Sequence, residues 1–248
     1  MRSRRALDGP RESFAVGKPW RDRSSVRSTG MHDHLLVMAK APVPGRSKTR
    51  LCPPCTPDQA AAIAEAALAD VLDAVAACGA GRKLLALDGS PGEWLPAGFE
   101  VFPQQGDGFD ERLAHAWRTA GGPGLQVGMD TPQVTAAELD DALARLHDPG
   151  VDAVLGPALD GGWWAIGLHR PDDRVFFGIP MSRDDTGRRQ RDRLDELGLR
   201  TALLPAQLDI DHFDDARTVA ALAPRLRTAK AVAAVQATLA ETAPAAPR

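Results

Sequence analysis

The stretch LLVMAKAPVPGRSKTRL, residues 35–51, decides the fold of this chain. Residues 35–39 form a short apolar run, which predicts a buried strand. A basic loop follows and leads to Thr56 and Pro57, which open an alanine-rich stretch that reaches Ala77. Threonine at the N-cap and proline in the first turn favour a helix start. A strand, a loop and a long helix in this order are typical of an α/β fold.

The same alternation continues along the chain. Thr135, followed by Glu138 three residues later, predicts a helix that starts with a capping box. Strands that alternate with helices of about 10–15 residues indicate parallel βαβ units. The sequence therefore predicts a three-layer α/β/α sandwich around a mostly parallel sheet. Further strands are predicted at residues 84–87, 100–102, 125–129, 152–155, 163–168 and 200–204, and further helices at residues 109–120, 135–147, 184–197, 214–222 and 225–239.

The composition excludes several classes of protein. Hydrophobic residues make up 44% of the 248 residues, which is enough for a sizeable core. A net charge of -3 argues against a dedicated nucleic-acid binder, because such proteins usually carry a basic face. No stretch approaches the roughly 18 consecutive apolar residues of a membrane span. Three cysteines cannot staple a secreted fold of this size, so the cytoplasm is the expected location.

Three parts are expected along the chain. Residues 1–32 are predicted to form a disordered basic tail, because seven Arg and one Lys lie within the first 30 positions. Met31 directly precedes the first strand. The alternative interpretation is that translation starts at Met31 and that the start of the chain is assigned too far upstream. Residues 33–240 are predicted to form a single domain, and the Ala/Pro-rich residues 241–248 a frayed end.

The loop after the first strand concentrates positive charge. Lys40, Arg46, Lys48 and Arg50 lie within eleven residues, beside Gly45, which lets the backbone approach a ligand. Ligands of open α/β sheets bind outside the carboxyl ends of the strands. Because Arg and Lys match phosphate oxygens, the loop predicts a site for a di- or triphosphate. The glycine spacing is not that of a Walker A loop. A solvated basic loop remains the alternative interpretation.

Acidic residues follow two later strands. Asp130 stands before Thr-Pro at the end of residues 125–129, and Asp209 and Asp211 alternate with Ile210, which sends both carboxylates to one side. Mg²⁺ binds one or two carboxylates together with substrate phosphates and waters. The pattern predicts a divalent-metal site, for Mg²⁺ or Mn²⁺, at Asp130, with Asp209 and Asp211 as a second candidate pair of ligands. Bracing of the turn by Asp130 and capping of the helix near Asp214 are the alternatives.

Glycine-rich motifs mark two further candidates. Asp160 is followed by Gly161 and Gly162, and the lack of side chains there indicates that something approaches closely. Trp163 and Trp164 follow at strand spacing, so one is expected in the core and the other is a candidate to line a pocket. The alternative is a simple hairpin turn. Residues 106–112, which include Asp107, open a helix whose free N–H groups suit a phosphate or sugar hydroxyl, although ordinary capping explains them as well.

Five ordered stretches between residues 33 and 220 resemble a bacterial glycosyltransferase-A-like family, the arsenosugar-biosynthesis-type glycosyltransferases. They are KAPVPGRSKTRL (40–51), GDGFDER (106–112), GMDTP (128–132), LGPALDGGWWAIGL (155–168) and LDID (208–211). More distantly, the chain is similar to phospholactate guanylyltransferases and molybdenum-cofactor nucleotidyltransferases. The resemblance implies a nucleotide-diphosphosugar-transferase fold, a basic loop that holds nucleotide phosphates, and acids such as Asp130 and Asp211 that hold the metal.

The chain departs from the family pattern at three places. Trp163 and Trp164 stand where the family usually has a Tyr pair, and Thr131 stands where Cys is common. The sequence around Asp130 also lacks the second Asp of a full D-x-D motif. These departures affect the glycosyltransferase mechanism more than the fold.

Three functions follow from this set of residues. The first is an enzyme that transfers a sugar from a nucleotide-diphosphosugar to a small-molecule acceptor, with Asp160 as a candidate base and a Trp stacked on the sugar admitted by Gly161 and Gly162. The second is a nucleotidyltransferase that uses an NTP and a phosphorylated small molecule. The third is a non-catalytic nucleotide-binding protein. In all three, Lys40, Arg46, Lys48 and Arg50 neutralise the phosphates.

Overall fold

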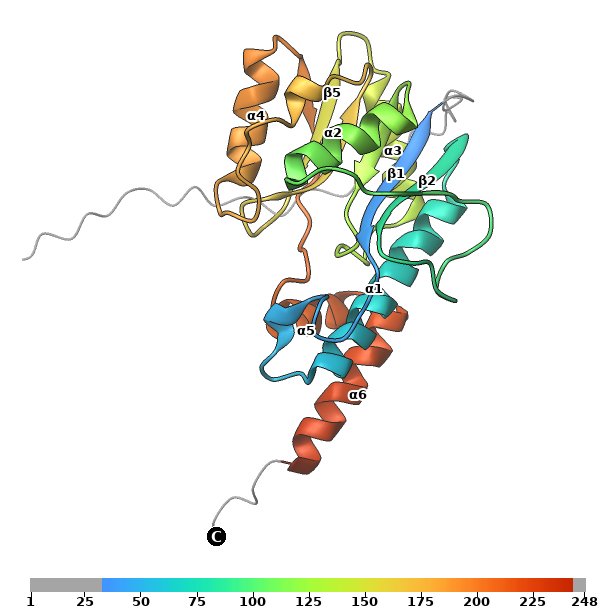
Figure 1. Cartoon of the computed structure of the whole chain (residues 1–248), viewed down its shortest axis with the longest axis vertical. Coiled ribbons are helices and arrows are strands. Elements are labelled where there is room, and N and C mark those ends of the chain that lie inside the picture. Colours follow the sequence, from blue (N-terminus) through green and yellow to red (C-terminus); the bar gives the residue numbers. More distant parts are fainter. Residues whose placement is uncertain (1–32, 243–248) are drawn as a thin grey trace, which may run out of the picture.

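A mixed sheet of seven strands forms the centre of the part that the computed structural model describes, residues 33–242 (Figure 1). The strand order is β3-β2-β1-β4-β6-β5-β7. All neighbouring strands run parallel except β6, which is antiparallel to both β4 and β5. The strands are β1 (His34–Lys40), β2 (Arg82–Asp88), β3 (Glu100–Pro103), β4 (Gly124–Val127), β5 (Ala153–Pro157), β6 (Trp163–Leu168) and β7 (Thr201–Leu203).

Helices cover both faces of this sheet. One face packs against α1 and α3, and the other against α2 and α4, so the predicted three-layer α/β/α sandwich is confirmed (Figure 1). The helices are α1 (Pro57–Ala77), α2 (Phe109–Ala120), α3 (Ala136–Leu146), α4 (Thr186–Glu196), α5 (Phe213–Leu222) and α6 (Arg227–Thr242), with short 3-10 turns η1 (Thr49–Leu51) and η2 (Asp173–Val175).

Strand β1 is the central strand of the core. Leu35 and Val37 pack on the side of α1 and α3, whereas Leu36 and Met38 pack on the side of α2. A strand that is buried on both faces needs a continuous apolar run rather than an alternating one. This explains why residues 35–39 are apolar throughout, and it aims the loop after Lys40 at the carboxyl edge of the sheet.

The helix starts follow their capping signals. Thr56 accepts a hydrogen bond from the backbone N–H of Gln59, whose side chain accepts one from the N–H of Thr56. Thr135 and Glu138 form the same reciprocal capping box at the start of α3. Both sets of bonds satisfy N–H groups that a helix leaves unpaired. The predicted boundaries of α1 and α3 are therefore accurate to within one residue.

A second, helical part of the molecule lies beyond the carboxyl ends of the strands. There α5 and α6 pack against α1, and all three share an apolar cluster that includes Leu51, Ile210 and Phe213 (Figure 1). Leu51 comes from the basic loop and Ile210 from the acidic LDID segment. Burial of these two residues in one cluster brings the two polar segments next to each other.

The connection between β5 and β6 is a tight turn. Ala158 N–H donates to the carbonyl of Gly162 at 3.1 Å, and Gly161 N–H donates to the carbonyl of Ala158 at 3.1 Å. The two strands pair in an antiparallel register. The hairpin interpretation of the Asp160-Gly161-Gly162 motif is therefore confirmed as its local structure.

Some sequence predictions fall outside the described residues. The predicted basic tail, residues 1–32, lies there, and so do residues 243–248 of the predicted frayed end, whereas α6 includes residues 241 and 242. None of the helices between residues 33 and 242 has the length and apolar character needed to cross a bilayer.

A buried histidine predicts acid sensitivity. His34 is 0% exposed and contacts the Trp117 ring edge-on at a centroid distance of 5.1 Å. Burial, with a smaller contribution from Arg82 that Glu100 opposes, lowers the pKa of His34 from 6.5 to about 4. As the pH falls, the unfolded chain therefore binds a proton at His34 before the folded protein does. The contribution of neutral His34 to the unfolding free energy is complete above pH 6.5 and is lost as the pH falls towards 4.

We expect the unfolding free energy of the variant His34→Leu to fall less than that of the wild-type protein when the pH is lowered from 6.5 to 4. The two decreases should differ by on the order of 3 kcal/mol. Urea unfolding at a series of pH values measures this difference. Equal slopes for the wild-type protein and the variant would show that His34 does not cause the acid sensitivity.

Candidate functional site

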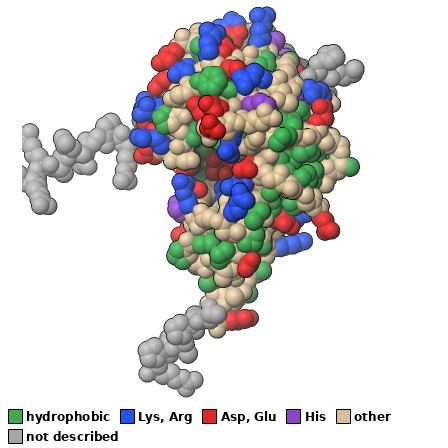
Figure 2. Space-filling model, in the orientation of Figure 1, with side chains coloured by type: hydrophobic (Ala, Val, Ile, Leu, Met, Phe, Trp, Pro, Cys, Tyr) green, Lys and Arg blue, Asp and Glu red, His purple; other side chains and the backbone are tan. Residues whose placement is uncertain are grey.

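A cavity of about 410 Å³ opens at the carboxyl edge of the sheet, between the sheet and the helical part. Figure 2 shows a hollow at this level, with acidic and basic side chains around it. Its charged lining residues come from strand ends, loops and the start of α2, which are far apart in the sequence, as predicted for an open α/β sheet. They are Lys40, Lys48, Arg50, Asp88, Arg112, Asp130, Asp160, Arg183, Asp209 and Asp211.

The basic loop is held in a defined turn. The Ser47 hydroxyl donates to the carbonyl of Ala41 at 2.7 Å and accepts from the N–H of Val43 at 3.2 Å. Gly45 (φ 72°) and Lys48 (φ 47°) both adopt left-handed backbone conformations. This conformation is uncommon for a residue with a side chain and indicates that the loop is strongly constrained at Lys48.

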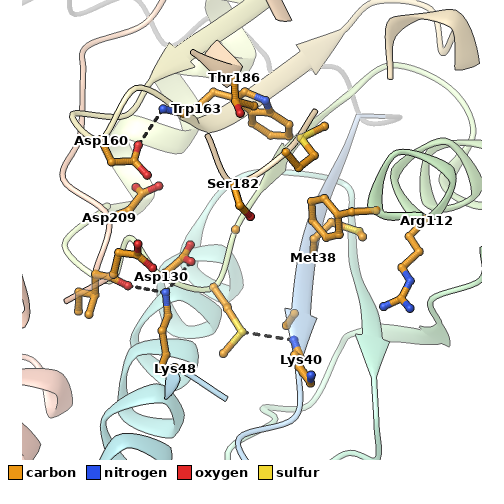
Figure 3. Close-up of a pocket in the computed structure, with 18 of the residues that line it drawn as sticks. Met38, Lys40, Lys48, Arg112, Asp130, Asp160, Trp163, Ser182, Thr186 and Asp209 are labelled. Carbon is orange, nitrogen blue, oxygen red and sulfur yellow. Dashed lines mark hydrogen bonds and ion pairs between the residues drawn. The ribbon is translucent and has the colours of Figure 1, made fainter. Parts of the chain in front are cut away.

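The basic loop contacts the two acidic segments directly. The Lys48 ammonium lies 2.8 Å from Asp130 Oδ2 and also donates to the carbonyl of Ile210 (Figure 3). The Arg50 guanidinium lies 2.6 Å from Asp211 Oδ2. Positive side chains near the start of the domain and aspartates that lie about 80 and 160 positions later therefore meet in one cavity.

Three carboxylates gather beside Lys48, and Figure 3 shows Asp130, Asp160 and Asp209 on the same side of the cavity. Burial raises the pKa of Asp209 to about 7, and the negative charges of Asp130 and Asp160 act in the same direction. The Thr131 hydroxyl donates to Asp209 at 3.0 Å and opposes this shift. The cluster therefore has an excess of negative charge that favours a bound cation.

One backbone contact aligns the two acidic segments. The N–H of Ile210 donates to the carbonyl of Asp130 at 2.9 Å, while the Ile210 side chain is buried in the helical part. The carboxylates of Asp209 and Asp211 consequently both face the cavity. The sequence pattern indicated this shared direction, although the resemblance named only Asp211 of the two as a metal ligand.

Several predicted site residues lie elsewhere. Gly45, Arg46 and Asp107 are exposed and lie outside the set of residues that line the cavity. Trp164 is 3% exposed and belongs to the core, where its indole N–H donates to the carbonyl of Pro205 at 2.9 Å. Trp163 lines the cavity. The two tryptophans thus divide between core and cavity.

Glycines 161 and 162 have a packing role. A Cβ atom on Gly161, which has φ +91°, would lie 2.0 Å from the carbonyl oxygen of Asp184. Gly187 N–H also donates to the carbonyl of Gly161 at 2.8 Å. The group that approaches this turn is therefore the segment before α4. Of the two glycines, only Gly162 lines the cavity.

Other lining residues escaped the sequence analysis. Asp88 and Arg112 form an ion pair at 3.5 Å, and the amide nitrogen of Gln104 donates to the carbonyls at the ends of β1 and β2. Asp88 ends β2 and Gln104 follows β3, so reading the residue after every strand finds both. Ser182 (φ 59°), from the segment before α4, and Thr186, the first residue of α4, also line the cavity, and no sequence signal indicated either.

The carboxylates of the cavity fit a hard divalent cation if a bound substrate supplies the remaining ligands. Within residues 33–242 no three His, Cys, Asp or Glu side chains are grouped so that they hold a metal by themselves. Asp130 and either Asp209 or Asp211 supply one or two carboxylates, and Mg²⁺ or Mn²⁺ commonly completes such a set with substrate phosphates and waters. The residues therefore fit a metal ion that binds together with its substrate.

The sequence matches a protein-family model over residues 60–183, half of the chain, described as "Uncharacterized protein conserved in bacteria (DUF2064)". The chain belongs to this family. No curated protein matches the sequence. The matched segment includes the GDGFDER, GMDTP and DGGWW motifs, whereas the basic loop and the LDID segment lie outside it.

Solved structures share the fold. A "putative nucleotide-diphospho-sugar transferase" from Desulfovibrio desulfuricans G20 is 25% identical, with a TM-score of 0.75 over 85% of this chain and 97% of that one. A cytidylyltransferase from Leptospira borgpetersenii is 11% identical, with a TM-score of 0.55 over 88% and 100%. A CMP:2-keto-3-deoxy-manno-octonic acid synthetase in complex with CTP is 12% identical, with a TM-score of 0.51 over 78% and 99%.

These likenesses confirm the predicted nucleotide-diphosphosugar-transferase fold. The Desulfovibrio chain, at 25% identity, is named a "putative nucleotide-diphospho-sugar transferase", which supports the prediction that this chain is an enzyme. These comparisons do not confirm the arsenosugar-specific part of the predicted resemblance.

The packing at Gly161 yields a prediction. We expect Gly161→Ala to lower the unfolding free energy by about 2 kcal/mol more than Gly178→Ala, because overpacking adds to backbone strain. Gly178 is a matched control, since it has φ +74° but no atom within 4 Å of the position that a Cβ would occupy. Chemical denaturation measures both variants. Equal losses would show that contact with Asp184 is unimportant.

Proposed function

We propose that the chain is a metal-dependent transferase that uses a nucleotide-diphosphosugar as its donor. The observation that carries this proposal is the meeting of the basic loop with Asp130 and Asp211 in one cavity at the carboxyl edge of the sheet. The 25% identity to a chain named as such a transferase, over 97% of its length, supports the same donor class.

The basic side of the cavity suits a diphosphate. Lys40, Lys48 and Arg50 all line it, and Lys40 forms no ion pair with a carboxylate among residues 33–242. An ammonium that is free of a carboxylate is available to a phosphate oxygen without the loss of an existing pair. Arg46, which the sequence also suggested, is exposed outside the cavity and has no part in this proposal.

The acidic side suits the metal. Asp130, with Asp211 or Asp209, would hold Mg²⁺ or Mn²⁺, which stabilises the leaving nucleotide diphosphate when it is bound. These carboxylates stand next to Lys48 and Arg50 of the basic loop, so a cation that they bind would be close to a diphosphate held by that loop. The positive loop and the cation therefore share the charge of the diphosphate between them.

The upper wall of the cavity suits the sugar. Trp163 presents its half-buried ring there, and Gly162 leaves room beside it. Asp160, whose Oδ1 accepts the N–H of Gly162 at 2.8 Å, is exposed on the same wall and is our candidate for the base that takes the proton of the acceptor. The acceptor is a small molecule.

A nucleotidyltransferase is the second candidate. Arg112 also lines the cavity, where it pairs with Asp88 at 3.5 Å, and its guanidinium offers donors for a third phosphate of an NTP. An acceptor phosphate would then attack the α-phosphate of an NTP and release pyrophosphate. A nucleotide-binding protein without turnover is the third. The cytoplasmic location expected from the cysteine content remains a prediction.

Ligand-induced thermal shifts distinguish these functions. Nucleotide sugars and NTPs are each tested with Mn²⁺, and hydrolysis or transfer products are followed by chromatography. We expect the largest shift and slow donor hydrolysis with one nucleotide sugar. Stabilisation by NTPs alone would favour nucleotidyl transfer, and binding without any turnover would favour the non-catalytic protein.

Removal of one carboxylate tests the metal assignment. We expect Asp130→Asn to abolish the Mn²⁺-dependent part of the thermal shift, because a neutral amide is a poor ligand for a hard cation. Asp192→Asn is the control, since Asp192 is exposed on α4 and pairs only with Arg188 in the described structure. A variant at Asp130 that keeps wild-type Mn²⁺-dependent binding would refute the assignment.

A further inference from the structure

Two of the three carboxylates that the proposed function considers for the metal, Asp130 and Asp211, are already paired with cations of the basic loop. Lys48 holds Asp130 at 2.8 Å, and Arg50 holds Asp211 at 2.6 Å (Figure 3 shows the Lys48 contact). The two cations are two positions apart on one loop. The groups expected to bind phosphate therefore neutralise the groups expected to bind metal.

The two pairs differ in their surroundings. The Lys48 side chain is 13% exposed, and its ammonium also donates to the carbonyl of Ile210. The Arg50 side chain is 55% exposed. An exposed ion pair is weakened by water and salt, whereas a partly buried one is screened less. The two carboxylates are similarly exposed, at 33% for Asp130 and 30% for Asp211, so the difference lies in the cations. The Lys48–Asp130 pair is therefore the stronger of the two.

The position of Lys48 has a consequence for metal binding. A divalent ion bound to Asp130 would lie close to the Lys48 ammonium, and like charges that are poorly screened repel each other strongly. The repulsion ends only if Lys48 leaves Asp130 for another anion, or if an anion binds between the two cations. A diphosphate in the adjacent basic loop meets both needs.

We infer that Lys48 is a built-in counter-ion that makes divalent metal and polyphosphate bind together rather than one after the other. This inference rests on the proposed function, because it requires Asp130 to be a metal ligand. Metal alone binds weakly, since it must compete with the Lys48 ammonium. Polyphosphate removes that competition, and by linkage each ligand raises the affinity of the protein for the other by the same factor.

Mn²⁺ binding, followed by equilibrium dialysis in which total Mn²⁺ on the protein side is compared with total Mn²⁺ on the protein-free side so that Mn²⁺–pyrophosphate in solution cancels, tests this inference with inorganic pyrophosphate as the polyphosphate. We expect the wild-type protein to bind Mn²⁺ at least about tenfold more tightly when pyrophosphate is present. We expect Lys48→Met to bind Mn²⁺ alone at least about tenfold more tightly than wild type, and to gain less than about threefold from pyrophosphate.

Three further variants control for misfolding, for net charge and for the exposure of the ion pair. Lys48→Gln retains a hydrogen-bond donor towards Ile210 without the charge, so it replaces the Met variant if that protein fails to fold in a thermal unfolding check. Lys40→Met removes a cation that has no ion pair in the described part of the chain, and should weaken pyrophosphate binding but not the binding of Mn²⁺ alone. Arg50→Met should give a smaller gain than Lys48→Met, because its pair is exposed.

The outcomes separate the inference from the function on which it rests. If wild type binds Mn²⁺ with pyrophosphate, but neither Lys48 variant gains affinity for Mn²⁺ alone, the inference is overturned and the metal site stands. An equal gain in Lys40→Met would also overturn it, because the effect would then reflect net charge. If no variant binds Mn²⁺ even with pyrophosphate, the proposed function fails and the inference fails with it.

Discussion

The contact between the Lys48 ammonium and the Asp130 carboxylate joins the loop after the central strand to the loop after its neighbour β4. The other features of the cavity are arranged around this contact. The same ammonium reaches the carbonyl of Ile210, which brings the third chain segment into the site. A partly buried ion pair costs desolvation, and good geometry with further hydrogen bonds offsets that cost. The site therefore depends on how accurately the surrounding fold positions these side chains.

The helical part of the molecule holds the two charged segments in position. Leu51 directly follows the charged residues of the basic loop, and Ile210 stands between the two aspartates of the LDID segment. Both side chains are buried between α1, α5 and α6. Apolar burial is non-directional by itself, but close packing allows few alternative arrangements of the backbone. The apolar residues in these motifs therefore orient the charged residues that stand beside them. This accounts for the alternation of Asp and Ile in residues 208–211.

The elements of the fold were largely predictable, for a local reason. The capping residues Thr56 and Thr135 and the apolar run at residues 35–39 act through neighbours within a few positions. Two features were not predictable in this way. The need for glycine at position 161 arises from Asp184, which is distant in sequence, and the αL backbone at Ser182 has no local signal. Both depend on how the segment before α4 packs against the β5–β6 turn.

The sequence by itself determined the sheet, its helices and the edge at which polar residues gather, because strand and helix periodicity and capping are properties of short segments. It also indicated that Lys48, Arg50, Asp130 and Asp211 belong to one site, because loops at the carboxyl ends of parallel strands meet. Only the tertiary structure decided which cation pairs with which carboxylate, that Arg46 lies outside, and that Asp209 is half-buried near Asp130. Such pairings depend on distances of a few ångströms between distant segments, which no local pattern encodes.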